Sequence, residues 1–165
     1  MKLNSLQDLY LSELRDLYDA EHRIVKALPK MAEAAGSPDL RNAFNEHLGQ
    51  TRNQVSRLEQ IFQMLGEPAK AKKCKGMEGI IDEGEEMMDD DAPPAVRDAA
   101  LIASAQRVEH YEIAAYGSCR TFAMRLGLPD QARLLQQTLD EEGATDKKLT
   151  GLAESYVNEE AKSAR

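Results

Sequence analysis

The sequence predicts an all-α protein built as a bundle of four long helices. Its 165 residues are rich in Ala, Leu, Glu, Gln, Lys and Met, which favour helices, whereas aromatic residues make up 5%. Apolar residues recur every three or four positions along four long stretches, which is the period of an amphipathic helix. Gly, Ser and Pro stand between stretches, where helices end and begin.

The first helix is expected over residues 4–35. Ser5, with Asp8 three residues later, resembles a helix N-cap with an acidic partner in the first turn. Gly36 is expected to cap the other end. The stripe that should face the core consists of Leu6, Tyr10, Leu14, Leu17, Glu21, Ile24, Leu28 and Met31.

The second helix is expected over residues 38–65, because Ser37 can cap it and Pro38 suits its first turn. Gly66 and Pro68 then end it. Its core-facing stripe consists of Phe44, His47, Thr51, Val55, Leu58, Phe62 and Leu65.

Residues 66–94 differ in composition from the helical stretches. They are rich in Lys and then in acidic residues, and they close on two prolines. A short helix is expected inside this bridge, over residues 77–88. The third long helix is expected over residues 94–126 and the fourth over residues 129–160, each with Pro in its first turn.

The long bridge decides the topology. Short turns make the first two helices antiparallel, and likewise the last two. A bridge of this length can travel along the whole bundle and leave the second and third helices parallel, which is the ferritin-like arrangement. An up-down-up-down bundle with a loose loop is the alternative, although long structureless loops are uncommon in compact domains. We therefore expect one ferritin-like domain over residues 1–165, with a short extra helix in the crossover.

Charge and composition exclude several classes of function. The formal net charge of −8 disfavours binding to nucleic acid, which requires Lys and Arg against phosphates. No apolar run reaches the roughly 20 residues that a membrane helix needs. Cys74 and Cys119 match no metal-binding spacing, and no signal peptide is evident. These features indicate a cytoplasmic protein with two free thiols.

Acidic residues interrupt the stripes that should face the core. Burying one unpaired carboxylate costs several kcal/mol, and too few basic residues share these stripes to pair them all. Inward carboxylates and a histidine from facing helices are typical of di-iron and di-manganese sites. A salt bridge at the rim, or a hydrogen-bonded core histidine, is the ordinary alternative for any one of them. The candidate metal ligands are Glu21, His47, Glu109, Glu112, Glu142 and Asp146.

Four segments carry a resemblance to a known family. They are "LYDAEHRIVKALPKM", "CKGMEGIIDEGEE", "DAALIASAQRVEHYEIAAYG" and "LLQQTLDEEGATDKKLTGLAE". Together they resemble the YciE/YciF family of bacterial stress-associated proteins over nearly the whole chain. The resemblance implies a ferritin-like bundle similar to rubrerythrins, a candidate ferroxidase activity and a homodimer.

The resemblance also implies a ligand pattern, which this chain matches in part. Glu21, Glu109 and Glu142 match the glutamates of helices one, three and four, and Glu112 resembles the additional helix-three glutamate of rubrerythrins. The family pattern has Glu-x-x-His on helices two and four. Thr145 stands where the helix-four histidine would be, and Asp146 could replace it. Helix two lacks the motif altogether and leaves four candidates open, namely His47, Gln50, Thr51 and Gln54.

The leading hypothesis is therefore a dinuclear site with two irons per chain, manganese being the other possible metal. Its chemistry would be oxidation of Fe(II) by O₂ or peroxide in a stress response, with no catalytic residue assigned. The alternative is a non-catalytic helical stress or scaffold protein with a vestigial or single-metal site. An iron-storage cage is a third option, although nothing in the sequence encodes a large shell.

Overall fold

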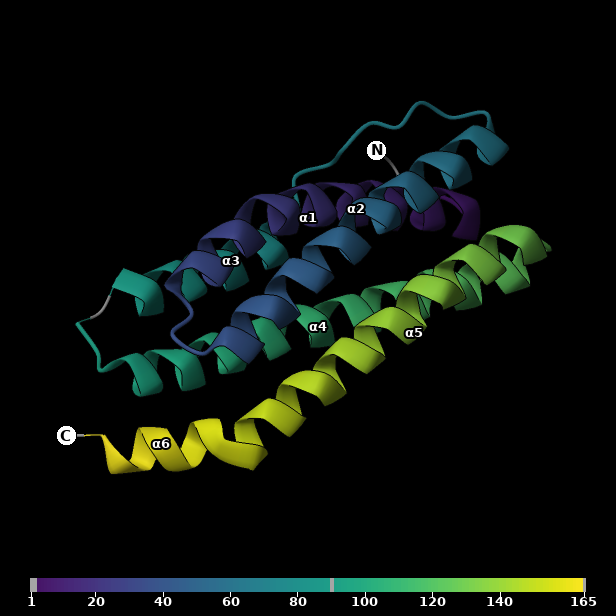
Figure 1. Ribbon diagram of the computed structural model, residues 1–165. Helices are drawn as coiled ribbons and strands as arrows, with labels where there is room; N and C mark the ends of the chain where they lie inside the picture. Colours follow the sequence, from purple (N-terminus) through teal and green to yellow (C-terminus); the bar gives the residue numbers. More distant parts are fainter. Residues whose placement is uncertain (1–2, 90, 165) are drawn as a thin grey trace.

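The computed structural model describes residues 3–89 and 91–164 of the chain. Four long helices make the bundle, and a shorter one lies in the crossover (Figure 1). The elements in order are α1 (Leu6–Ala34), α2 (Pro38–Leu65), α3 (Lys75–Asp89), α4 (Pro94–Arg125), α5 (Pro129–Leu152), the π-helical turn η1 (Ala153–Val157) and α6 (Asn158–Ser163). No helix in the described residues is both long and apolar enough to cross a membrane.

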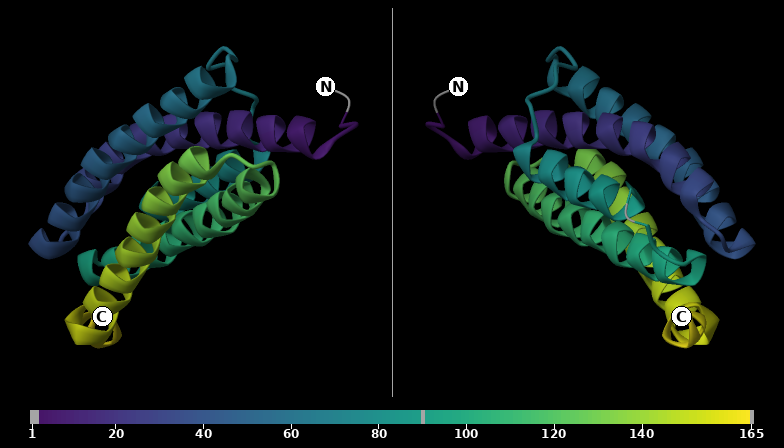
Figure 2. Two further views of the ribbon diagram at one scale, coloured as in Figure 1. Left: turned by 90° about the vertical axis from the view of Figure 1, so that its right-hand side faces the viewer. Right: turned by 90° about the vertical axis from the view of Figure 1, so that its left-hand side faces the viewer.

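The bundle consists of two antiparallel hairpins, α1–α2 and α4–α5, which lie one above the other (Figure 2). The crossover after α2 runs back along the molecule before α4 begins, so that α2 and α4 run in the same direction (Figure 1). The predicted all-α, ferritin-like bundle with a helix in its crossover is thereby confirmed, and the up-down-up-down alternative is wrong.

Helix boundaries follow the predicted stop and start signals closely. Ser5 caps α1 by accepting a hydrogen bond from the Asp8 backbone N–H at 3.1 Å, and Asp8 in turn accepts one from the Asn4 N–H. Ser37 caps α2 by accepting from the Leu40 N–H at 3.3 Å. Gly66, after α2, has a φ of 67°, the left-handed conformation that glycine adopts most easily.

The predicted cap at Gly36 is wrong. The helix ends at Ala34, Ala35 is its C-cap, and Gly36 does not adopt a positive φ. The turn is instead held from outside, because Asp98 on α4 accepts hydrogen bonds from the Gly36 N–H at 2.8 Å and the Ser37 N–H at 2.7 Å. This carboxylate joins the first hairpin to the second.

Replacing Asp98 by Ala is expected to lower the free energy of unfolding by about 1.5–3 kcal/mol, because two N–H groups lose a charged acceptor in a buried setting. Urea denaturation followed by circular dichroism would measure the change. Asp140→Ala is the matched control, since Asp140 is exposed and accepts a hydrogen bond only from Gln136 within the described residues. A loss no larger than that of the control would contradict this role for Asp98.

Two further boundaries differ from the prediction. The crossover helix spans Lys75–Asp89 rather than residues 77–88. The last helix was expected to run unbroken over residues 129–160, but it widens into the π-helical turn η1 and continues as α6. This turn carries Tyr156, whose hydroxyl lies 2.5 Å from Ser37 Oγ. The hydrogen bond ties the C-terminal segment to the turn between α1 and α2.

The crossover is fixed to α1 rather than loose. Before α3 begins, the Lys72 N–H donates to the Arg15 carbonyl at 3.0 Å, and the Cys74 N–H donates to Asp19 Oδ2 at 2.9 Å. Cys74 is fully buried, as is Cys119, and both are free thiols. A crossover held in this way lets α3 cover one side of the bundle.

The buried apolar residues form two clusters, one toward each end of the bundle. On α1, for example, Leu17 belongs to one cluster and Ile24 to the other, and the buried Glu21 lies between them. On α4, Val108 and Tyr116 belong to different clusters and enclose Glu109 and Glu112. A layer of buried polar side chains therefore divides the core at mid-length.

Candidate metal centre

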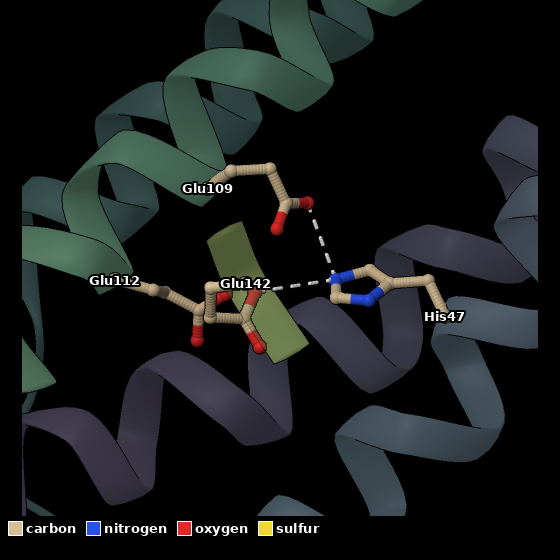
Figure 3. A group of neighbouring side chains, drawn as sticks. All are labelled: His47, Glu109, Glu112 and Glu142. Carbon is tan, nitrogen blue, oxygen red and sulfur yellow. Dashed lines mark ion pairs between the residues drawn. The ribbon is translucent and has the colours of Figure 1, made fainter. Parts of the chain in front are cut away.

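Four side chains from three helices converge in the polar layer (Figure 3). His47 comes from α2, Glu109 and Glu112 lie one turn apart on α4, and Glu142 comes from α5. One ligand atom from each lies within 4.8 Å of the others. None of the four side chains is more than 3% exposed. The spacing of Glu109 and Glu112 along a helix turn is what directs both carboxylates to the same point.

The converging atoms have too few hydrogen-bond partners. Both oxygens of Glu112, Oε2 of Glu109, Oε2 of Glu142 and Nε2 of His47 are buried without a hydrogen bond. Among the described residues, His47 is the one basic side chain that pairs with these carboxylates; its Nε2 lies 3.2 Å from Glu109 Oε1 and 3.8 Å from Glu142 Oε2. Buried polar atoms are normally satisfied, so these indicate a place for a bound cation.

His47 is oriented from its far edge. Its Nδ1 lies 3.3 Å from Gln50 Oε1 and 3.4 Å from Thr145 Oγ1. When the Nδ1–H donates to Gln50, the Nε2 lone pair points at the glutamates and is free to bind a metal ion. Gln50, which the sequence left open as a ligand, thus contacts the Nδ1 edge of the imidazole, away from the glutamates. Thr145, which stands where the family pattern has histidine, also contacts His47 Nδ1 and not the glutamates.

Replacing Gln50 by Ala is expected to weaken metal binding about 10–100-fold, because the imidazole loses the group that fixes its tautomer and orientation. Titration with Fe(II) or Mn(II) against a chelator of known affinity would measure the dissociation constant. Gln63→Ala is the matched control, since Gln63 is exposed on the same helix α2. Equal affinities in the two variants would rule out an orienting role for Gln50.

Glu21 lies beside the four converging side chains and is fully buried on α1. Its carboxylate accepts a hydrogen bond from the Tyr116 hydroxyl, and its Oε2 has no partner. Glu21 also adjoins Glu112, with which it can share a proton. Tyr116 was not among the candidate residues predicted from the sequence. The available signal was that Tyr116 follows Glu112 by four residues on the same face.

The two remaining candidates on α2 differ in their contacts. Thr51 donates its hydroxyl to the His47 carbonyl at 2.9 Å, a bond within its own helix. Gln54 is fully buried, and its amide N–H donates to Glu142 and, at 3.0 Å, to Glu141. Its carbonyl oxygen has no hydrogen-bond partner. Of the two, Gln54 is the one with a buried, unpartnered oxygen, while its amide nitrogen faces Glu142.

Asp146 is not brought into the cluster. Its side chain is 21% exposed, Oδ1 accepts a hydrogen bond from Gln106 at 3.0 Å, and the same oxygen lies 3.3 Å from His110 Nε2. It follows Glu142 by one helical turn on α5 and lies at the packing interface with α4. It contributes a negative charge near the site rather than an atom within it.

Burial raises the carboxyl pKa values of the polar layer. It raises the pKa of Glu109 to about 7. Burial and the neighbouring Glu142 raise the pKa of Glu21 to about 8. Burial and the adjacent Glu109 raise the pKa of Glu142 to about 9, and the pKa of Glu112 also lies well above its usual range. In the metal-free protein, protons therefore neutralise part of a charge that a cation would otherwise balance.

These residues fit a metal ion. One imidazole and several carboxylates form a donor set that suits iron and manganese, and the ligand atoms are buried, convergent and unpartnered. The helices that carry them pack closely on both sides of the polar layer, and the site is held by elements rather than by loops. The cluster can therefore hold a metal ion.

Comparisons with known proteins agree with the fold. Residues 5–162 match the model of the family described as "Domain of unknown function (DUF892)". The chain is 44% identical over 162 residues to Protein YciF of Escherichia coli (strain K12), which covers 98% of each protein. It likewise matches the crystal structure of the E. coli stress protein YciF with a TM-score of 0.90, covering 94% of this chain and 98% of that one.

Two further solved structures share the architecture. YcfI of Rhodopseudomonas palustris, described as a candidate structural protein, is 43% identical with a TM-score of 0.89, covering 90% of this chain and 95% of that one. A protein from Xanthomonas campestris pv. campestris is 18% identical with a TM-score of 0.74, covering 93% of this chain and 94% of that one, and it shows the shared fold alone. On the family match and the near full-length identity, this chain belongs to the DUF892 family of YciF-like proteins.

Proposed function

We propose that the protein is a ferritin-like iron-binding oxidase of the stress response, which binds two Fe(II) per chain and oxidises them with O₂ or peroxide. The observation that supports it is the set of convergent, buried ligand atoms without partners on α2, α4 and α5. The kinship with the E. coli stress protein YciF supports the cellular setting. Manganese has the same ligand preferences and is the other candidate metal.

The reaction balances with either oxidant. One O₂ accepts two electrons from two Fe(II) ions and two protons from solvent, which yields two Fe(III) and one H₂O₂. One H₂O₂ accepts the same two electrons and two protons and yields two Fe(III) and two waters. Bound iron would supply the electrons, and the protein side chains would supply the binding site.

Each side chain has a defined part in this proposal. Glu109, Glu112 and Glu142 would bind the cations, with His47 completing one metal position through Nε2. Glu21 Oε2 and the Gln54 carbonyl oxygen, both buried and unpartnered, would serve the second position. The Tyr116 hydroxyl holds one Glu21 oxygen, and the apolar clusters on either side exclude bulk water.

The decisive experiment begins with protein purified without metal and loaded anaerobically with Fe(II). Elemental analysis is expected to find about two irons per chain. Mixing with O₂ or with peroxide should then produce the near-ultraviolet absorbance of oxo-bridged Fe(III). One iron or fewer per chain, with no spectral change, would contradict the dinuclear oxidase.

That negative result would favour a non-catalytic structural protein. Two observations favour this second candidate: helix α2 supplies no carboxylate to the cluster, and the relative YcfI is described as a candidate structural protein. Such a protein would be as stable without metal as with it.

The proposal further includes a cytoplasmic homodimer that binds neither nucleic acid nor membrane, and gel filtration with light scattering would test the dimer.

A further inference from the structure

An apolar cavity adjoins the metal centre and extends under the crossover helix. Its inner end is formed by His47 and Glu109, and its outer wall by half-buried side chains of α3. The exposed lining between these ends is almost entirely carbon. The apolar residues that line it are chiefly Ile24, Leu28, Phe44, Ile81, Ala105 and Val108.

The size of the cavity restricts what it can hold. Its volume is about 30 Å³. A single water needs roughly 10–15 Å³ by the same measure, whereas sites for drug-sized ligands or acyl chains run to roughly 300–1,000 Å³. The cavity therefore suits a diatomic or similarly small molecule and is too small for a lipid tail or an organic substrate.

The lining decides which small molecule is favoured. Water and H₂O₂ would lose hydrogen bonds in the carbon-lined part of the cavity between α3 and the metal centre, at a cost of a few kcal/mol. Apolar cavities in proteins stay dry and bind apolar guests such as xenon. O₂ is apolar and makes no strong hydrogen bonds, so it enters such a space without this penalty.

A second opening reaches the Nδ1 side of His47 and shares His47, Thr145 and Lys148 with the lining of the apolar cavity. It lies between α2 and α5, has a volume of about 70 Å³, and is lined by Glu46, His47, Gln50, Thr145 and Lys148 together with two alanines. Glu46 and Lys148 form an ion pair across its mouth. Its lining has a larger polar share than that of the apolar cavity, so that ions and peroxide would enter this opening more readily than the cavity.

We propose that the apolar cavity beneath α3 is a binding site for O₂, held directly beside His47 and Glu109. The inference rests on the proposed function, because it assigns O₂ rather than peroxide as the oxidant that this cavity admits. The cavity itself, however, can be tested in the metal-free protein.

The first test uses xenon as a probe. Crystals of metal-free protein pressurised with xenon are expected to show a xenon atom in this cavity. Ala105→Leu places three extra carbons in the cavity one turn before Glu109 and should remove the xenon. Ala115→Leu is the matched control, because Ala115 lies on the same helix outside the lining and should leave xenon bound. Absence of xenon from the unsubstituted protein would overturn the proposal.

The second test compares the oxidants in iron-loaded protein. Ala105→Leu is expected to slow oxidation by O₂ at least tenfold and to leave oxidation by peroxide within twofold of the unsubstituted rate. Equal slowing with both oxidants would overturn the assignment of O₂ to this cavity. If Ala105→Leu does not fold, Ile81→Phe on the half-buried outer wall provides the same comparison.

The two tests separate this inference from the proposed function. A failure of the protein to oxidise iron with either oxidant would contradict the proposed oxidase function. Xenon binding in the same protein would still show that the apolar cavity binds small apolar molecules. Oxidation of iron without xenon binding would support the oxidase function and refute the O₂ site in the apolar cavity.

Discussion

Replacing Glu112 by Leu is expected to stabilise the metal-free protein by about 1–4 kcal/mol and to abolish its response to metal. Both oxygens of Glu112 are buried without a hydrogen-bond donor, and the carboxyl group lies beside Glu21. A charged carboxylate is unfavourable in this low-dielectric interior, and a protonated carboxyl group there still lacks the hydrogen bonds that it makes with water. A leucine of similar size removes that cost and adds apolar surface to the core.

The prediction follows from a conflict between stability and binding. A group selected for folding alone would not stand unpartnered at 0% exposure on the core face of α4. If Glu112 is present for a cation, its removal should improve folding and remove function together. Residues at functional sites commonly show this trade between stability and activity.

Thermal and urea denaturation of the metal-free variants would measure the effect, with and without added Fe(II) or Mn(II). Glu33→Leu is the matched control, since Glu33 is exposed on α1 and the same substitution there should change stability by about 0.5 kcal/mol or less. Destabilisation of the metal-free protein by Glu112→Leu would show that the carboxylate has a structural role instead.

Most of the fold could be predicted because its signals are local. The repeat of apolar residues fixed which stretches are helices, and Ser37 and Pro38 located the start of α2 to the residue. What failed depended on distant partners. Gly36 was read as a helix cap, but its backbone is held by Asp98 from α4, which no local pattern reveals. The π-helical turn at Tyr156 likewise accompanies a contact across the bundle.

The candidate site was predictable to the extent that it depends on helix faces. The 3.6-residue period places Glu21, Glu109, Glu112 and Glu142 toward the core, and the structure finds all four buried. Asp146 lies at the edge of its stripe. At that edge, a small rotation of the helix determines whether the side chain points into the core or into the interface between α4 and α5. Its actual partners, Gln106 and His110, lie on another helix.

The roles of Gln50 and Tyr116 also could not be read from the sequence. Helical spacing says which face a side chain lies on, but hydrogen bonding depends on the direction of its terminal atoms. Gln50 approaches the Nδ1 side of His47, and Tyr116 reaches Glu21 across two helices. The contact between Tyr116 and Glu21 requires the packing of α1 against α4, which follows from the whole fold.

Metal loading is expected to raise the free energy of unfolding by about 4 kcal/mol when the free ion stands at 1,000 times its dissociation constant. The ion binds the folded cluster of ligands, which the unfolded chain does not form, so binding must stabilise the folded state. Differential scanning calorimetry of metal-free and loaded protein would measure the gain. Equal melting temperatures would favour the non-catalytic structural protein.

This gain should increase with pH. In the metal-free protein, the pKa values of Glu109 and Glu142 are raised to about 7 and about 9. The unfolded value is about 4.3, so between these limits the folded state binds more protons than the unfolded state. Stability of the metal-free protein therefore falls as pH rises from about 5, by up to about 1.4 kcal/mol per pH unit for each such group, and levels off above the folded pKa values.

Metal binding has the opposite dependence, because the ligands must lose their protons before they bind a cation. Raising the pH removes the protons that neutralise the polar layer and leaves the cation as the remaining means of balancing its charge. The difference in melting temperature between loaded and metal-free protein should consequently widen from pH 5 to pH 8, with Mn(II) as the probe to avoid oxidation. A difference that stays constant over this range would mean that the buried glutamates do not bind the metal.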